Sequence, residues 1–137
     1  MSKMMEDRIT PDLVRSLGPD EIFVFGSNRA GMHGGGAAAA AHMYFGAVWG
    51  QGIGLQGQSY AIPTMEGGVD YVGGYVDEFI IFAKNHPELK FLVTEIGCGI
   101  AGFTPQEIAP LFRDAISLSN VSLPRRFWEI LKANGGG

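Results

Sequence analysis

The order of segments along the chain predicts an α/β fold, with a mostly parallel, twisted sheet and helices on both of its faces. Short apolar segments typical of buried strands alternate with segments of helical character. In two places a strand-like segment runs directly into a glycine-rich loop that is followed by a helix-like segment. Strands and helices that alternate in this way form parallel sheets, because each helix returns the chain to the starting end of the next strand.

We expect one domain over residues 1–137, because the length suits a single hydrophobic core and neither a repeat nor a domain boundary is visible. Hydrophobic residues make up 46% of the chain and charged residues 18%, which is a globular rather than a disordered composition. Residues 134–137, an asparagine followed by three glycines, are expected to fray.

Charge and cysteine content exclude several classes of protein. The formal net charge of −4 and the pI of about 5.2 lack the basic footprint of a general nucleic-acid-binding protein. A single cysteine, Cys98, cannot form an internal disulfide, which favours a reducing, cytoplasmic location. The polar N-terminus is no signal peptide, and no apolar run approaches the roughly 18 residues of a membrane span. No cluster of Cys, His and acidic residues has metal-ligand spacing, so neither a metal nor another cofactor is expected.

Local signals place three elements in the first third of the chain. Thr10 suits a helix N-cap and a proline follows it, which predicts a helix over Pro11–Leu17 that ends at Gly18. Glu21–Phe25 is short, β-branched and aromatic, as in a buried strand. Ala37–Phe45 is an alanine-rich run with strong helix propensity.

The middle of the chain is expected to add two strands and one helix. Gly46–Gly57 is predicted to be irregular, and Ser59–Pro63 to form a strand that the proline ends. After a linker over residues 65–72, apolar residues at helical spacing predict a helix over Gly74–Asn85. Phe91–Ile96 is the third buried strand.

The last third begins with a helix start. Thr104 and Glu107 form a capping box around a proline at the first helical position. Asn120–Leu123 is predicted to be a short edge strand, and Pro124–Lys132 a final helix or turn.

Both glycine-rich loops, Gly26–Gly36 and Gly97–Phe103, follow a predicted strand and precede a predicted helix. Ligands of open α/β sheets bind beyond the carboxyl ends of the strands, and free N–H groups at a helix N-terminus attract phosphate. Arg29 is the one charged residue in either loop, so backbone amides would hold a phosphate. Two such loops facing each other predict a diphosphate site, and the alternative is that their glycines only make turns.

Familiar nucleotide-binding motifs fit the chain poorly. The G-x-x-x-x-G-K-[ST] signature of a P-loop is absent. The first loop lacks G-x-G-x-x-G directly after its strand, and no acidic residue ends a second strand about 20 residues later. A Rossmann dehydrogenase is therefore disfavoured.

The two loops resemble those of macrodomains, a family that binds ADP-ribose. Asn28, followed by a histidine-glycine run and a helix, resembles the first macrodomain loop. Ile96–Phe103 is similar to the second, and its I-G-C-G form resembles the class that includes terminal ADP-ribose protein glycohydrolases and DNA ADP-ribosyl glycohydrolase antitoxins. The run from Glu21 to Pro124 also looks like small bacterial and phage macrodomain-like proteins.

The resemblance implies a three-layer α/β/α macrodomain-like fold with a cleft for ADP-ribose or a related nucleotide, which an ADP-ribosylated macromolecule could present. It places the first loop near the distal ribose and phosphate, through Gly26, Ser27, Asn28, Gly34, Gly35 and Gly36. It has the second loop supply amides to the diphosphate, through Gly97, Cys98, Gly99, Ile100, Ala101 and Gly102, and has Phe103 pack against a sugar.

The resemblance supports a shared ligand better than it supports the hydrolytic activity of that class, because two catalytic residues are not matched. Where that class has a catalytic aspartate this chain has Ala101, and where it has a lysine this chain has Thr64 and Met65. We therefore expect a protein that binds its ligand, and the alternative is a hydrolase of ADP-ribosyl or phosphate-ester bonds in the same cleft. A further alternative is an interaction protein that has kept the fold and no longer binds a ligand.

His33, Glu95 and Asn28 are candidates for a different catalytic route, and the alternative for Asn28 is that it only caps a turn. His33 is either a general base or phosphate donor, or a solvated loop residue. Glu95 is the last polar residue of its predicted strand, and its side chain is expected to point either into the cleft or to Thr or Lys neighbours. Cys98 is expected to be an inert, buried thiol rather than a nucleophile. Trp49 is expected either to cover an adenine or to pack in the core.

Overall fold

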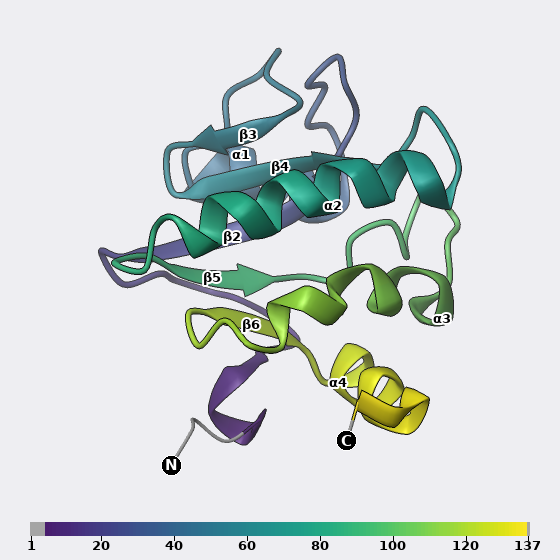
Figure 1. The fold of residues 1–137 in the computed structure, drawn as a ribbon. Coiled ribbons are helices and arrows are strands. Elements are labelled where there is room, and N and C mark those ends of the chain that lie inside the picture. The colour runs from purple at the N-terminus through teal and green to yellow at the C-terminus, as the bar shows by residue number, and fades with distance from the viewer. Residues whose placement is uncertain (1–4, 137) are drawn as a thin grey trace.

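A computed structural model describes residues 5–136 and shows a six-stranded sheet in the order β1-β6-β5-β2-β4-β3 (Figure 1). Its strands are β1 (Ile9–Thr10), β2 (Glu21–Ser27), β3 (Gly54–Gln56), β4 (Ser59–Pro63), β5 (Lys90–Val93) and β6 (Val121–Pro124). β2 lies between β5 and β4 and pairs parallel with both. β5, β6 and β1 are also parallel, and β3 alone is antiparallel. The predicted mostly parallel sheet is confirmed, and the carboxyl ends of β2, β4 and β5 meet at one edge.

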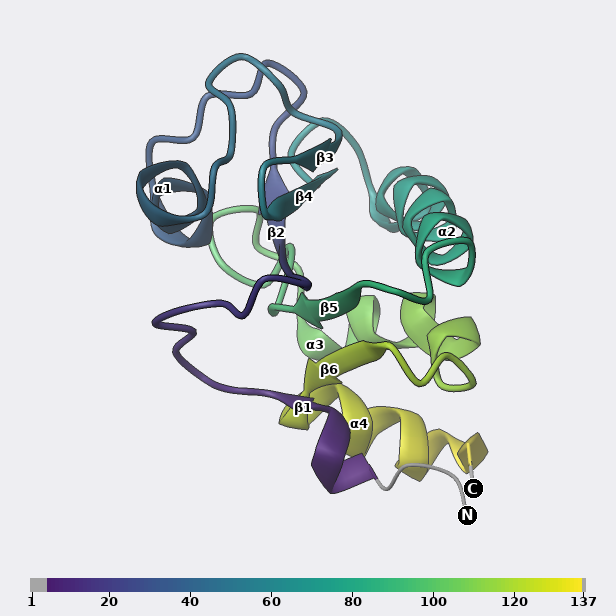
Figure 2. The same ribbon diagram turned by 90° about the vertical axis from the view of Figure 1, so that its left-hand side faces the viewer.

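Helices cover both faces of the sheet, as Figure 2 shows in a view along it. α1 (Gly36–Tyr44) lies on one face, over a small core that includes Phe23 and Phe25 of β2. The larger core on the other face includes Ile22 and Val24 of the same strand. It is covered by α2 (Val69–Lys84), α3 (Pro105–Ile108), the 3-10 helix Ala109–Ala115 and α4 (Arg125–Leu131). Successive side chains of β2 therefore point to opposite cores, which explains why its sequence is apolar without alternation.

The predicted N-terminal helix over Pro11–Leu17 is wrong. Residues 11–18 form an extended segment that crosses the sheet on the side of α1 (Figure 2). The chain must pass from β1 to β2 across β6 and β5, about 14 Å at roughly 4.8 Å per strand spacing, and must also return to the other end of the sheet. A seven-residue helix would span only about 10 Å, so the connection stays extended.

Other differences concern short or edge elements. β3 lies inside the stretch Gly46–Gly57 that was expected to be irregular, and the 3-10 helix Met5–Arg8 and β1 were not predicted. β6 is not an edge strand, because β1 pairs along its outer side. α2 begins at Val69 and so takes in the second half of the expected linker.

β5 ends at Val93, three residues before the predicted end at Ile96, so Glu95 follows the strand instead of belonging to it. The remaining elements agree with their sequence signals. β4 has the predicted bounds, and Thr104 and Glu107 form the predicted capping box. α4 continues into a π-helical turn over Lys132–Gly136. The expectation that residues 134–137 fray extends to Gly137, which lies outside the described residues. Within the described part of the chain, no helix is both long and apolar enough to cross a membrane.

Candidate functional site

A cleft of about 430 Å³ opens at the carboxyl ends of β2, β4 and β5, between the two glycine-rich loops. From the first loop and the start of α1 it is lined by Gly26, Ser27, Asn28, Met32, Gly35, Gly36, Ala37 and Ala38. From the other strand ends and the second loop it is lined by Thr64, Met65, Thr94, Glu95, Ile96, Gly97, Cys98, Gly99, Ile100 and Ala101. The parallel arrangement of the strands thus brings together most of the residues that the sequence pointed to.

The first loop is held in shape by its own side chains. Asn28 closes a turn, since its Nδ2 donates to the Met32 carbonyl at 3.1 Å and its Oδ1 accepts from the Met32 amide at 2.9 Å. Ser27 Oγ donates to the Gly52 carbonyl at 2.5 Å. Both side chains therefore form the wall of the cleft and have their main hydrogen bonds within the protein.

α1 presents an uncapped N-terminus to the cleft. Its N-cap residue, Gly35, has no side chain to bond the first amides, and the first backbone bond into the helix runs from Ala39 to the Gly35 carbonyl. The N–H groups of Gly36, Ala37 and Ala38 therefore have no hydrogen-bond partner among the described residues. Such groups carry the partial positive charge of the helix and suit an anion.

The second loop presents a matching set of free amides. Its turn is closed by bonds from the Cys98 amide to the Glu95 carbonyl, from Gly102 to Gly99 and from Phe103 to Gly97. The three consecutive amides of 99–101 have no partner in the described part of the chain. Gly97 adopts a φ of +74°, which a glycine reaches without strain, and so allows the strand to turn into the loop.

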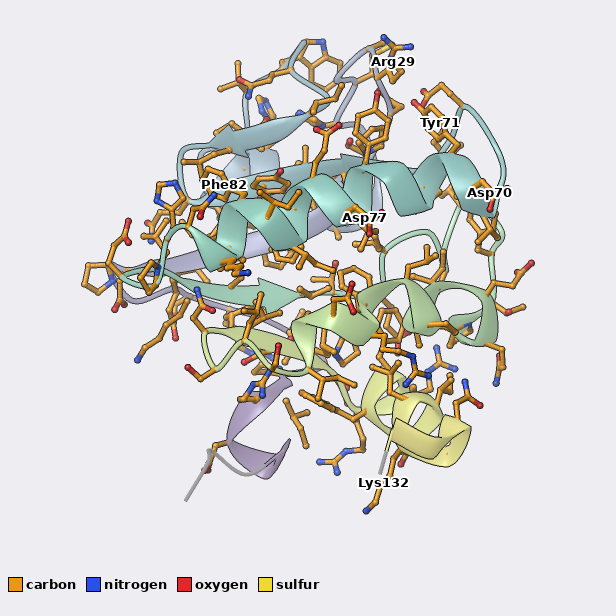
Figure 3. The ribbon with its side chains drawn as sticks, in the orientation of Figure 1. Arg29, Asp70, Tyr71, Asp77, Phe82 and Lys132 are labelled. Carbon is orange, nitrogen blue, oxygen red and sulfur yellow. The ribbon has the colours of Figure 1, made fainter. Side chains whose placement is uncertain are left out.

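Charge in the cleft is confined to one ion pair. Glu95 is the one charged residue in the lining, and Arg126 of α4 binds it through Nε to Oε2 at 2.8 Å and Nη2 to Oε1 at 2.6 Å. The hydrogen bonds and charge of Arg126 hold the pKa of the Glu95 carboxyl below its ordinary value. Arg29, the charged residue of the first loop, lies outside the lining and is exposed beside the region of Tyr71 (Figure 3).

A second pocket of about 730 Å³ adjoins the cleft. The two have Gly36, Ala37, Thr94 and Glu95 in common in their linings, and we refer to the adjoining pair as the groove. The second pocket has apolar side chains of the extended N-terminal segment and of β2 in its wall, together with four charged residues: Asp12, Glu95, Arg125 and Arg126.

His33 lies behind the first loop and not in the cleft. It is only 2% exposed, and its Nε2 lies 2.8 Å from the Val48 carbonyl and 3.0 Å from the Gln51 carbonyl. Two carbonyl acceptors at one nitrogen require that Nε2 carries the proton, while Nδ1 is buried without a partner. The ring also packs against Phe25 and Trp49. His33 therefore ties the first loop to residues 48–51.

Several other expected residues also lie outside the lining. Gly34 and Gly102 are in the loops but do not line the cleft, and Trp49 is half exposed beside His42. Phe103 packs below the second loop against the larger core. Arg126 was missed, because no local pattern reports which side chain of a distant helix reaches Glu95. Thr94 was missed although it directly follows β5 and precedes Glu95.

Cys98 lines the cleft as a protonated thiol. Burial, with the nearby Glu95 carboxylate as the second cause, raises the pKa of Cys98 to about 11. Its Sγ lies 3.5 Å from the Ile96 carbonyl. A thiol with this pKa is a poor nucleophile at neutral pH.

Comparison with known proteins gives no match among family models, curated proteins or solved structures. The resemblance to macrodomains therefore rests on the amino-acid sequence alone.

Proposed function

We propose that this protein binds ADP-ribose, or a closely related nucleotide, with the diphosphate between its two glycine-rich loops. The observation that carries the proposal is the pair of free amide sets, Gly36–Ala38 and 99–101, in the lining of one cleft. The single carboxylate in that lining is neutralised by Arg126. An anion in the cleft would therefore meet backbone donors with little charge repulsion.

The amides are sufficient for useful affinity without a lysine. A hydrogen bond to a charged group contributes about 1.5–3 kcal/mol, so three or four of them can reach the roughly −8 kcal/mol of micromolar binding. Part of the entropic cost is avoided, because the loops are already ordered by their internal hydrogen bonds.

The length of the groove supports a nucleotide rather than a free diphosphate. The adjoining pocket has room for a base, and the side chains of Leu13, Val14 and Phe23 give it an apolar wall. A ligand that places its diphosphate between the amide sets would reach this pocket past Gly36 and Glu95.

Binding is better supported than hydrolysis. Ala101, Thr64 and Met65, at the positions where the resembling hydrolases carry aspartate and lysine, all line the cleft and bring no titratable group to it. His33 is buried behind the loop, and Glu95 is engaged by Arg126.

Isothermal titration calorimetry with ADP-ribose, ADP and AMP tests the proposal. ADP-ribose should bind with micromolar affinity, ADP more weakly and AMP most weakly, because AMP reaches only part of the groove. Absence of binding by ADP-ribose to the folded protein would refute the proposal, and equal affinity for AMP would show that the diphosphate is not recognised.

A further inference from the structure

One long stretch of the chain carries no charged residue. Residues 30–65 contain no Asp, Glu, Lys or Arg, so the ten basic and fourteen acidic residues of the chain all lie elsewhere. The stretch forms α1, β3, β4 and the loops that join them, and Figure 2 shows α1, β3 and these loops at one end of the molecule. Where this stretch is exposed, it therefore adds no charge to the surface.

Part of this uncharged stretch is both apolar and exposed. Tyr44 at the end of α1 is 70% exposed, and Trp49 is 53% exposed. Trp49 packs edge-on against the His42 ring of α1, and the Val48 amide donates to Gln56 Oε1 of β3 at 2.7 Å. These contacts join the end of α1, the following loop and β3 into one surface, which we call the apolar face. Its exposed large side chains are Met43, Tyr44, Val48, Trp49, Ile53 and Leu55.

β3 is the last strand of the sheet on this side, and a side chain already occupies carbonyls along its edge. Gln51 Nε2 donates to the carbonyl of Ile53 at 3.1 Å and to that of Leu55 at 3.0 Å. An extended peptide that paired with β3 would have to displace Gln51 to reach the same acceptors. A molecule that covers the apolar face therefore meets its side chains rather than its backbone.

The composition of the apolar face suits a second copy of the same chain. Interface cores of homodimers are rich in aromatic side chains and methionine and poor in charge. In a two-fold pair the same patch meets itself, so a patch without charge approaches its copy without repulsion. The face also holds Gly50 and Gly54, whose Cβ positions open onto free space, beside the large rings of Tyr44 and Trp49. It thus contains both bulky groups and low points that can receive them.

Other occupants fit this face less well. A nucleic acid requires lysine or arginine to neutralise its phosphates, and residues 30–65 provide neither. A charged protein surface would lose hydration against the apolar face and find no opposite charge there.

We propose that two copies of this protein associate through the apolar face, with Tyr44 and Trp49 packed near the two-fold axis. None of the six exposed side chains of the face lines the cleft or the second pocket, so both copies keep an open groove. The association is therefore independent of the proposed binding of ADP-ribose.

The test is the molar mass in solution, by sedimentation velocity and by light scattering after gel filtration, over a series of micromolar concentrations. The parent should approach twice the 14.7 kDa of one chain as its concentration rises. Tyr44→Glu places two like charges in the interface, so it should weaken association at least about hundredfold and sediment as a monomer. Ile81→Glu, at an exposed position of α2 outside the apolar face, is the matched control and should remain a dimer.

Two outcomes would overturn the proposal. A parent that stays monomeric over the whole series excludes the dimer, and this measurement needs no variant. A dimer that persists in a Tyr44→Glu protein with the parent's circular dichroism spectrum places the interface elsewhere. Calorimetry with ADP-ribose on Tyr44→Glu should give the parent's affinity, so failure of the dimer and failure of the proposed function are told apart.

Discussion

At the scale of single residues, the cleft is notable for how few reactive side chains it contains. Ala101, Thr64 and Met65 contribute no acid or base, and the Cys98 thiol is protonated at neutral pH. Glu95 is ionised, since Arg126 lowers the pKa of its carboxyl. These residues favour holding a ligand over transforming it, and two measurements examine that distinction.

The first measurement concerns turnover. A positioned acid or base contributes about 10²–10⁴-fold to a rate, so the parent protein should release little ADP-ribose from an ADP-ribosylated substrate by the aspartate–lysine route. The Ala101→Asp, Met65→Lys double variant should release it faster. Brisk release by the parent would contradict this prediction, and substitution of Glu95 and His33 would then locate the groups responsible.

The second measurement concerns Cys98 and pH. The thiolate is the form that reacts, and a thiol pKa of about 11 leaves little of it at pH 8. Alkylation by iodoacetamide at pH 8 should be about tenfold or more slower in the folded protein than in guanidinium, where the pKa returns to about 8.5. The folded-state rate should climb as the pH approaches 11. Equal rates in the folded and unfolded protein would show that the thiol is not buried as described.

At the scale of elements, the two loops are prearranged by close backbone contacts. A side chain at Gly52 would overlap the Asn28 carbonyl, and one at Gly31, whose φ is +73°, would overlap the backbone of Gln51. His33 Nε2 also contacts the carbonyls of Val48 and Gln51, in the same segment that packs against the first loop. The first loop is thus fixed against residues 48–52, and the second is fixed by its own turn.

Replacing Gly99 by valine should block the diphosphate. A Cβ at Gly99 meets no heavy atom within 4 Å and its φ is ordinary, so the variant should fold. Its side chain would, however, crowd the loop that is proposed to approach phosphate closely. We expect at least a tenfold loss of affinity for ADP-ribose by calorimetry. Gly102, with a φ of +83°, would suit the test less well, because any side chain there is strained.

Gly74→Val is the matched control for this experiment. Gly74 also has open space around its Cβ position, and it lies on the exposed side of α2, outside both pockets of the groove. Its affinity for ADP-ribose should equal that of the parent. Tight binding by Gly99→Val would place the ligand elsewhere.

At the scale of the whole molecule, the sheet could be predicted because its central strands are apolar on both faces. The segments that became β2 and β4 contribute to the cores on both faces of the sheet, and that burial is visible in composition alone. The order β1-β6-β5 could not be predicted, since β1 has only two residues and is defined by its pairing with β6. The N-terminal helix was predicted from local signals, and the distance between β1 and β2 overruled them.

The sequence was sufficient to predict which two loops form the candidate site, but not which of their residues line the cleft. The alternation of strands and helices along the chain predicts parallel strands, and the parallel pairing of β2 with β5 brings both loops to one edge of the sheet. Which loop residues face the cleft depends on turns, and so Gly34, Gly102 and Phe103 were included although they do not line it. The partner of Glu95 lies 31 positions along the chain, and no short-range pattern connects the two.

The most direct test of amide-mediated diphosphate binding is an ¹H–¹⁵N correlation spectrum recorded during titration with ADP-ribose. The amides of Gly36–Ala38 and of 99–101 should show the largest shifts, and those of β3 and of the exposed side of α2 should stay in place. AMP at saturation should move fewer of the amides in these two sets. No shift with ADP-ribose, or shifts confined to residues outside the groove, would contradict binding between the two loops.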